Sequence, residues 1–370
     1  MSADQSVFVT SVQDAAVDEL CQRRYWLQNL EGGIGLVRKD DLVPNALLEE
    51  SIRDIRTIGT MEDLTPGTIQ DAIDEITSAL SPEDKADVRK MECLYRRLGW
   101  LAAWALYVEP EVRVKYTNIP IDFNATYQRN PLWVMTTPGR VLQEKDAPQD
   151  TIYQEFMPFP QMLGRQHWLQ SWLYNIRLHI GIAAATDELN RMIDFGEVVG
   201  LAQGYRSSVD GRLSHPYVWA YRHKTTGRWA STISSLGAGS STPEWEAAPV
   251  WEFAGGVVRW VQQCGETVAR GQFPVSPRTT LNSNLLTGWG NKRLRREREI
   301  RAMGMPCRDN GQLRDIHFAQ STVACRPAMG DPCPFLKVCW DRSVAQAPLR
   351  TGDYVENSVN TPIIFEGSVH

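Results

Sequence analysis

Three of the seven cysteines lie close together near the C-terminus, in the pattern Cys325-x7-Cys333-x5-Cys339. Prolines and a glycine separate them, and these turn-forming residues let several thiolates converge on one centre, which a regular helix or strand would not allow. A fourth ligand must come from elsewhere in the chain. Cys21 is the best candidate, because it directly precedes basic and aromatic residues near the other terminus, and Cys307 is the alternative.

The segments around these cysteines resemble a known family. Cys-x-Arg-Arg-Tyr-Trp, which begins at Cys21, and CPFLKVC, which begins at Cys333, are similar to the iron-sulfur branch of the PD-(D/E)XK nucleases. That branch includes AddB-type helicase-nucleases, the CRISPR-associated four-cysteine exonucleases and many phage relatives. The resemblance implies that Cys21, Cys325, Cys333 and Cys339 hold a [4Fe-4S] cluster that joins the chain ends over a nuclease core. Four thiolates at similar spacing also suit Zn²⁺, which stays open as the alternative.

The chemistry of this family needs two carboxylates that hold Mg²⁺ against a phosphate, and a lysine that positions the water. The resemblance places an Asp after a turn in one strand, a Glu-x-Lys on the next strand and a Gln-x-x-x-Tyr helix after them. Gln170 and Tyr174 match the helix motif, and Glu155 matches the glutamate. Gly139 and Met157 stand in place of the Asp and the Lys.

Two further observations bear on this site. The metal-binding His that the family places in the first helical region, near Pro44 to Arg53, is missing. A second frame, with Gln203 and Arg222 in place of both acids and Lys224 retained, also fails and puts the Gln-x-x-x-Tyr helix on the wrong side. Other acids could migrate in to compensate, namely Glu109, Glu111, Asp146 and Asp150. Without such compensation, Glu155 is an edge-strand carboxylate that faces water.

The elements that must position these residues follow from the periodicity. Helices are expected from Asp14 to about Leu106, and three neighbouring strands at 111–116, 132–135 and 151–157. One helix from Leu169 to Ile180 should then place Gln170, Tyr174 and Arg177 side by side, where they could contact a phosphate or a base. Two further strands (197–205 and 217–223) and a second amphipathic helix (250–268) follow, and this order predicts an α/β fold.

The expected architecture is a central mixed sheet flanked by helices, a restriction-endonuclease-like core. Its divisions are a helical N-terminal region at 1–107, the core at 108–275, a basic helix and cysteine-rich segment at 276–345, and a tail at 346–370. Buried positions are expected for Cys93 and Cys264, which lie within helical patterns, and for four tryptophans, Trp100, Trp104, Trp168 and Trp172.

Basic residues are concentrated between Asn291 and Arg301, where six of them accompany two glutamates. We expect a mostly solvated helix whose Lys292, Arg293, Arg295 and Arg296 could follow a nucleic-acid backbone. A solvated helix face that binds no ligand explains the same pattern equally well.

Composition limits the remaining choices. The 370 residues carry a formal charge of −5, which excludes a strongly basic body for tight nonspecific nucleic-acid binding. No apolar run reaches the roughly 18 residues of a membrane span, and the first twenty residues lack an export signal. An odd number of cysteines then predicts a reducing, cytoplasmic compartment.

Three functions are compatible with these patterns. The first is a nuclease-fold, iron-sulfur protein that binds nucleic acid or a protein partner, with nuclease activity lost or strongly reduced. The second is an active DNA exonuclease that uses Mg²⁺ or Mn²⁺ at a rearranged site. The third is a four-cysteine zinc protein with a role in assembly.

Overall fold

The computed structural model describes most of the chain. The described residues are 7–30, 36–122, 125–136, 139–159, 165–206, 213–231, 244–321, 333–340, 348–351 and 353–356. Cys325 lies outside them, as do the segments 341–347 and 357–370.

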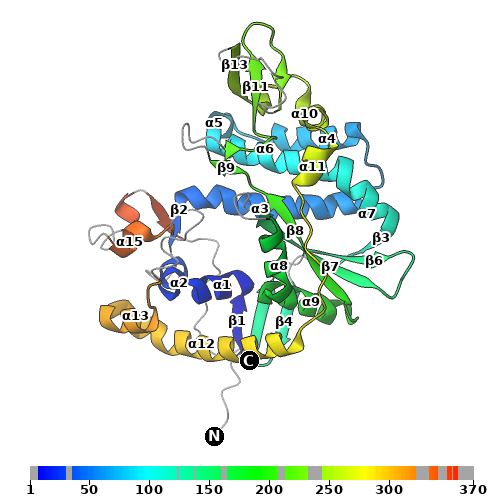
Figure 1. Ribbon diagram of the computed structural model, residues 1–370. Helices are drawn as coiled ribbons and strands as arrows, with labels where there is room; N and C mark the ends of the chain where they lie inside the picture. Colours follow the sequence, from blue (N-terminus) through cyan, green and yellow to red (C-terminus); the bar gives the residue numbers. More distant parts are fainter. Residues whose placement is uncertain are drawn as a thin grey trace.

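A four-stranded mixed sheet forms the centre of the molecule (Figure 1). Its order is β3 (Tyr116–Ile119), β6 (Arg140–Glu144), β7 (Thr151–Phe159) and β8 (Phe195–Ala202). The first three strands are antiparallel, whereas β7 and β8 are parallel. A parallel pair needs a crossover. Here it consists of α8 (Arg165–Ser171), the 3-10 turn η3 (Trp172–Tyr174) and α9 (Ile176–Leu189).

Both faces of this sheet are buried, and alternate residues of each strand point to opposite faces. Phe156 of β7 and Val199 of β8 belong to one apolar core, and Tyr153 and Val198 belong to the other. The helices α3 (Lys39–Thr60) and α6 (Val88–Ala103) and the π-helical turn η2 (Trp104–Val108) contribute to the first core, and α9 to the second. The prediction of four buried tryptophans is confirmed for Trp100, Trp104, Trp168 and Trp172, and that of buried cysteines for Cys93 and Cys264.

A second sheet joins the N-terminus to a later hairpin. β1 (Phe8–Ser11) pairs in parallel with β5 (Leu132–Thr136), which pairs in antiparallel with β4 (Ala125–Arg129). The expected strands at 132–135 and 151–157 therefore exist, but the prediction that they are neighbours is wrong. Residues of β1, β5, α9 and the long helix α12 (Ser283–Asp309) share one apolar core.

The two ends of the chain form one lobe, which we call the terminal lobe. It contains α1 (Val12–Leu20), α2 (Gln22–Asn29), β2 (Leu36–Arg38), α12, α13 (Gly311–His317), α15 (Leu336–Trp340), the turn η7 (Pro348–Thr351) and β14 (Tyr354–Glu356). β14 pairs with β2, and Tyr25, Phe318, Cys333 and Phe335 are buried in a common core. The expected divisions at residues 107, 275 and 345 stay a prediction.

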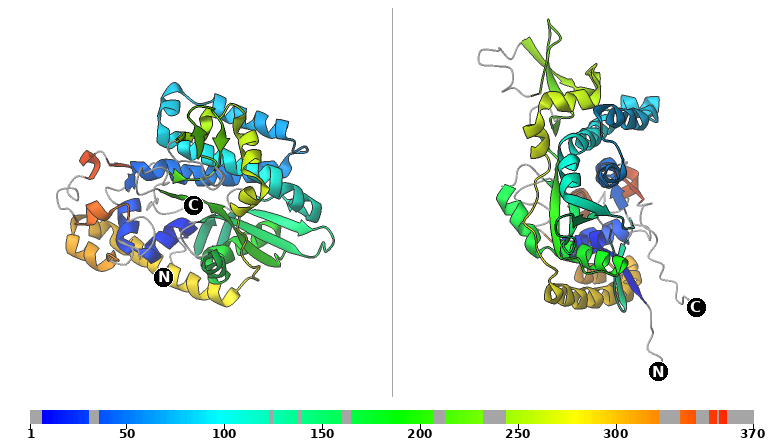
Figure 2. Two further views of the ribbon diagram at one scale, coloured as in Figure 1. Left: turned by 45° about the horizontal axis from the view of Figure 1, so that its top comes forward. Right: turned by 90° about the vertical axis from the view of Figure 1, so that its right-hand side faces the viewer.

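A small sheet projects at the end of the molecule away from α12 (Figure 2, right). It has the order β12 (Trp229–Ala230), β11 (Trp219–His223) and β13 (Trp245–Pro249). The remaining elements are α4 (Pro66–Ser78), α5 (Pro82–Ala86), α7 (Glu109–Lys115), β9 (Tyr205–Arg206), β10 (Leu213–Ser214), η6 (Val250–Glu252), α10 (Gly256–Cys264) and α11 (Glu266–Gly271).

Three expected elements differ from the structure for local reasons. The segment 111–115 is helical in α7, because Pro110 suits a first helical turn and the charges run from acidic to basic along the helix. The expected helix over 250–268 breaks at Gly256 and Gly265, whose φ angles are +76° and +85°. The tail is not wholly irregular, since β14 lies within it.

Candidate functional site

Glu155 lies at the centre of β7, on the face that α9 covers, and its exposed fraction is 0%. Arg177 of α9 donates to its Oε1 atom from Nη2 at 3.0 Å and from Nε at 3.3 Å. The hydroxyl of Tyr153, two residues earlier on the same strand face, donates to Oε2. The expectation of a water-facing edge carboxylate is therefore wrong: β7 is an inner strand, and Glu155 is a buried, paired charge.

Burial and the Glu155 carboxylate raise the pKa of Tyr153 well above its ordinary value. Tyr153 therefore stays protonated and acts as a hydrogen-bond donor at neutral pH. Its hydroxyl also accepts a hydrogen bond from the backbone N–H of Gly139 at 3.3 Å. Gly139, Tyr153, Glu155 and Arg177 thus form one contiguous group on this face of the sheet.

No side chain fits at Gly139, where the resemblance expects an acid. A Cβ atom there would lie 1.6 Å from the carbonyl oxygen of Gln154. The start of β6 packs directly on the β7 backbone, so an aspartate at this position requires the backbone to move. The main chain as well as the side chain at Gly139 therefore differs from what the resemblance to the nucleases implies.

Mg²⁺ does not fit the group around Glu155. The cation needs several oxygen ligands, but both oxygens of Glu155 already accept hydrogen bonds, and the guanidinium of Arg177 supplies the balancing positive charge. Met157, at the lysine position, is half-buried against the apolar core. Among the described residues, no three histidine, cysteine, aspartate or glutamate side chains come together in a way that could hold a metal ion.

Of the four acids considered as replacements, Glu109 and Glu111 pair elsewhere, and Asp146 and Asp150 lie in the connection between β6 and β7. Glu109 is buried on the opposite side of the sheet, where it accepts hydrogen bonds from Arg140 at 2.7 Å and from Trp104 at 2.9 Å. Glu111 is on the surface and pairs with Arg270. Arg140 continues this buried polar row through Gln154 to Glu197, residues that lie opposite one another on β6, β7 and β8.

The Gln-x-x-x-Tyr residues do not reach Glu155. Asn175 ends the helical stretch and caps α9, since its side chain accepts from the N–H of Arg177 at 2.9 Å. Gln170 is exposed on α8, and Tyr174 is 76% exposed. The prediction that Gln170, Tyr174 and Arg177 share one helix face is therefore wrong, and only Arg177 joins the site.

The second frame falls on a different part of the molecule. Gln203 follows β8, whereas Arg222 and Lys224 lie on or next to β11 in the small projecting sheet. Arg222 pairs with Glu246 and Glu252, each at 2.8 Å. These contacts hold the strand β13 and the turn η6 against β11.

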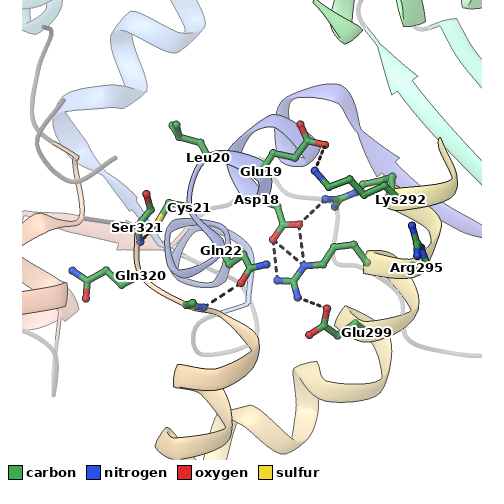
Figure 3. A pocket seen from close by; sticks show the side chains of 13 residues that line it. Asp18, Glu19, Leu20, Cys21, Gln22, Lys292, Arg295, Glu299, Gln320 and Ser321 are labelled. Atoms are coloured by element: carbon green, nitrogen blue, oxygen red, sulfur yellow. Dashed lines mark hydrogen bonds and ion pairs between the residues drawn. The ribbon is translucent and has the colours of Figure 1, made fainter. Parts of the chain in front are cut away.

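The cysteines of the two chain ends belong to the same lobe. Cys307, Cys333 and Cys339 contribute to the terminal-lobe core together with Tyr25 and Trp26, which follow Cys21 in the sequence. The Sγ atom of Cys21 accepts a hydrogen bond from the N–H of Ser321 at 3.5 Å (Figure 3).

The thiols are not gathered at one point within the described residues. No three histidine, cysteine, aspartate or glutamate side chains come together there in a way that could hold a metal ion. Cys325 falls outside the described part of the chain.

The basic residues of α12 divide into two sets, and the prediction that this segment is mostly solvated is wrong for half of the four named above. Arg293 is only 2% exposed and pairs with Asp18 of α1 at 2.8 Å and with Glu297. Arg296 pairs with Asp18 at 3.0 Å and with Glu299 at 2.7 Å. These two arginines tie α12 to α1.

Lys292 and Arg295 are exposed and line an open pocket of about 610 Å³, which lies between α12 and the turn that holds Cys21 (Figure 3). Lys292 lies 4.0 Å from Glu19, and Arg295 makes no ion pair with the described residues. Asp18 and Glu299 also line the pocket, so its charge is mixed.

No model of a known protein family matches the chain, and no curated protein matches it. Among the described residues, no helix has both the length and the apolar character that crossing a bilayer requires.

Proposed function

We propose that this protein is a nuclease-fold, iron-sulfur-cluster protein that binds nucleic acid or a protein partner and has lost efficient phosphodiester hydrolysis. The order of elements supports a relation to the nucleases: Gly139 precedes β6, Glu155 lies on the adjacent strand β7, and the helix with Gln170 follows. The single observation that carries the loss of activity is the pairing of buried Glu155 with Arg177.

This observation matters because catalysis by this chemistry requires an accessible, negatively charged metal site. Arg177 supplies a positive charge from the chain itself, which does not depend on metal concentration. It already satisfies the one retained acid, and the main chain leaves no room for the other at Gly139. A protein with this arrangement can keep the nuclease scaffold without its reaction.

The cluster part of the proposal concerns Cys21, Cys325, Cys333 and Cys339, which would hold the [4Fe-4S] group. Its support is that Cys21 contacts Ser321, four positions before Cys325, and that Cys333 and Cys339 lie in the core that also contains Tyr25. When bound, the cluster would join the two chain ends covalently through iron and sulfide.

The cluster is tested on anaerobically purified full-length protein. A brown solution that absorbs near ~400 nm, with iron and acid-labile sulfide in equal amounts, supports the proposal. A colourless protein that contains zinc replaces the cluster with the four-cysteine zinc alternative.

Activity is tested with end-labelled single- and double-stranded DNA in the presence of Mg²⁺ or Mn²⁺. We expect no cleavage that distinguishes the unmodified chain from Glu155→Gln. Efficient cleavage that Glu155→Gln abolishes would contradict the loss of activity and favour the rearranged exonuclease.

Binding is tested by the salt dependence of DNA affinity. Because Lys292 and Arg295 are exposed, the double change Lys292→Glu and Arg295→Glu should make the negative slope of log K against log salt shallower, by about 1.4 to 1.8. Lys85→Glu with Lys115→Glu, two exposed lysines on α5 and α7, is the matched control. An equal effect of both doubles would show that only net charge matters.

A further inference from the structure

The small projecting sheet presents aromatic side chains on one of its faces. Trp219, Tyr221 and His223 alternate along β11 and so point to the same side. Across the strand pair, His223 lies opposite Trp245, and Tyr221 lies opposite Ala247. We call Trp219, Tyr221, His223 and Trp245 the aromatic row.

The aromatic row is open to solvent. Its four side chains are only half-buried, and Ala247 in its centre is exposed, so a small residue stands where a larger one would cover the rings. On the opposite face of the same sheet, Trp229 packs on Phe253 and Trp260 and Ala248 is buried, while Arg222 and Glu246 form an ion pair that stays partly exposed. The aromatic residues are therefore not all needed for the core of the sheet.

Polar contacts fix the rings at both ends of the row. The indole N–H of Trp219 donates to Glu92 of α6 at 3.0 Å, and the ring packs edge-on against Trp251 at 5.8 Å. The backbone N–H groups of Thr225 and Thr226 donate to Nδ1 of His223, each at 3.2 Å. Rings held in this way lose little conformational freedom when a flat ligand stacks on them.

We propose that the aromatic row binds the bases of a single-stranded nucleic acid by stacking. Side chains two residues apart on a strand are separated by roughly 6.6 to 6.8 Å. Trp219, Tyr221 and the pair of His223 with Trp245, whose rings pack edge-on at 5.1 Å, can therefore each serve a separate base of an extended strand. A duplex keeps its base faces inside its own stack, so the row selects unpaired strands. Lys224 and Arg228 are exposed in the turn after His223, where the backbone of such a strand would leave the row, and Glu244 lies 3.6 Å from His223 at the same end.

This inference rests on the proposed nucleic-acid binding and adds its strand type. A proline-rich peptide would also contact aromatic rings, but such peptides use a groove between rings, whereas these side chains stand in line on an open sheet face.

The test compares labelled oligonucleotides of equal length, with bases and without bases, by fluorescence polarisation with the full-length protein. We expect the strand that carries bases to bind at least about tenfold more tightly than the abasic strand. Tyr221→Ala and Trp245→Ala should each weaken binding of the base-carrying strand roughly 5- to 100-fold and leave abasic binding unchanged. Trp340→Ala, which removes a 66% exposed tryptophan on α15, is the matched control and should change neither.

Each outcome decides the inference. Equal affinity for the two oligonucleotides overturns it, while the proposed binding through Lys292 and Arg295 still stands. Loss of base-carrying and abasic binding together, on Tyr221→Ala, also overturns it, because the change then acts through the fold or the backbone contacts. Absence of binding to any oligonucleotide overturns this inference together with the proposed nucleic-acid binding, and leaves a protein partner as the proposed function. Binding of a proline-rich peptide that depends on Tyr221, with oligonucleotide binding that does not, overturns this inference alone. The wild-type comparison remains decisive even where a variant does not fold.

Discussion

Glu155 keeps the residue type of a catalytic carboxylate but has the surroundings of a structural one. A buried ionised carboxylate is costly unless it is paired and hydrogen-bonded, and Arg177 and Tyr153 meet both needs. The guanidinium sits where a metal-dependent nuclease would need a metal. The charge of the site is thereby balanced inside the protein, without an ion from solution.

Removing both members of this pair should destabilise the fold by less than the sum of the two single changes. Glu155→Gln leaves Arg177 unpaired, and Arg177→Met leaves a buried carboxylate, so each single change should cost about 3 kcal/mol of unfolding free energy. The double variant should cost clearly less than the sum. Urea unfolding of the four proteins measures the coupling, and strictly additive losses would show that the two side chains do not interact.

Introducing the aspartate that the resemblance implies at Gly139 should not create a metal site, for steric reasons. Gly139→Asp places a side chain against the Gln154 carbonyl, and we expect a loss of roughly 1 to 3 kcal/mol of stability with no gain in Mg²⁺ affinity. Gly139→Ala is the matched control, since it has the same clash without the charge. Calorimetry that detects Mg²⁺ binding to the Asp variant alone would contradict this reading of the site.

At the scale of elements, the short strands and helices follow well from sequence, and their junctions do not. The pattern 151–157 predicts β7 because it is β-branched and aromatic, and the strand expected over 197–205 is found as β8, which ends earlier, at Ala202. The helix expected over 169–180 is interrupted at Asn175, which caps α9. Asparagine is a common capping residue, but the apolar spacing favoured one continuous helix. The pairing of β1 with β5 has no local signal, since it depends on contacts between distant segments.

The same reasoning explains the candidate site. Strand alternation places Tyr153 beside Glu155, so these two members of the buried group can be placed together from sequence alone. Arg177 could be named from sequence as a residue near the sheet, but not as the partner of Glu155, because that contact depends on where α9 begins. The division of the α12 arginines also depends on tertiary structure, since Arg293 is neutralised by Asp18 from the other end of the chain.

The turn before β11 should make the fold sensitive to acid. His215 is buried, its Nε2 lies 3.1 Å from the carbonyl of Ala202, and burial, with Arg96 nearby, lowers its pKa well below 6.5. Below pH 6.5 the unfolded chain binds a proton that the folded chain does not, so stability falls as pH falls, by up to about 1.4 kcal/mol per pH unit.

Thermal unfolding between pH 7 and 5 measures this slope. His215→Gln should reduce it, although His179, whose pKa burial also lowers, leaves a part of it in place. Asp14 and Glu297, whose pKa values burial raises, act in the opposite sense, so the comparison with the variant isolates the histidine. An unchanged slope would contradict the assignment to His215.

At the scale of the whole molecule, buried ion pairs join the two chain ends in addition to any cluster. Arg293→Met leaves the buried Glu297 without its partner and Asp18 with Arg296 alone, and we expect a loss of about 3 kcal/mol. Arg298→Met, an exposed neighbour on the same helix, should change stability by less than about 0.5 kcal/mol. Equal effects of the two variants in urea unfolding would show that the α1–α12 contact does not support the lobe.

The pairing of β2 with β14 also sets an order of events during synthesis. Leu36 is synthesised about 320 residues before its partner Glu356. At about 5 to 20 residues per second, β2 waits roughly a quarter of a minute to a minute for the strand that completes its pair. Until then the apolar side chains of α2 lack the contacts that Phe335 and Tyr354 supply in the finished core, which makes this segment a natural client for chaperones.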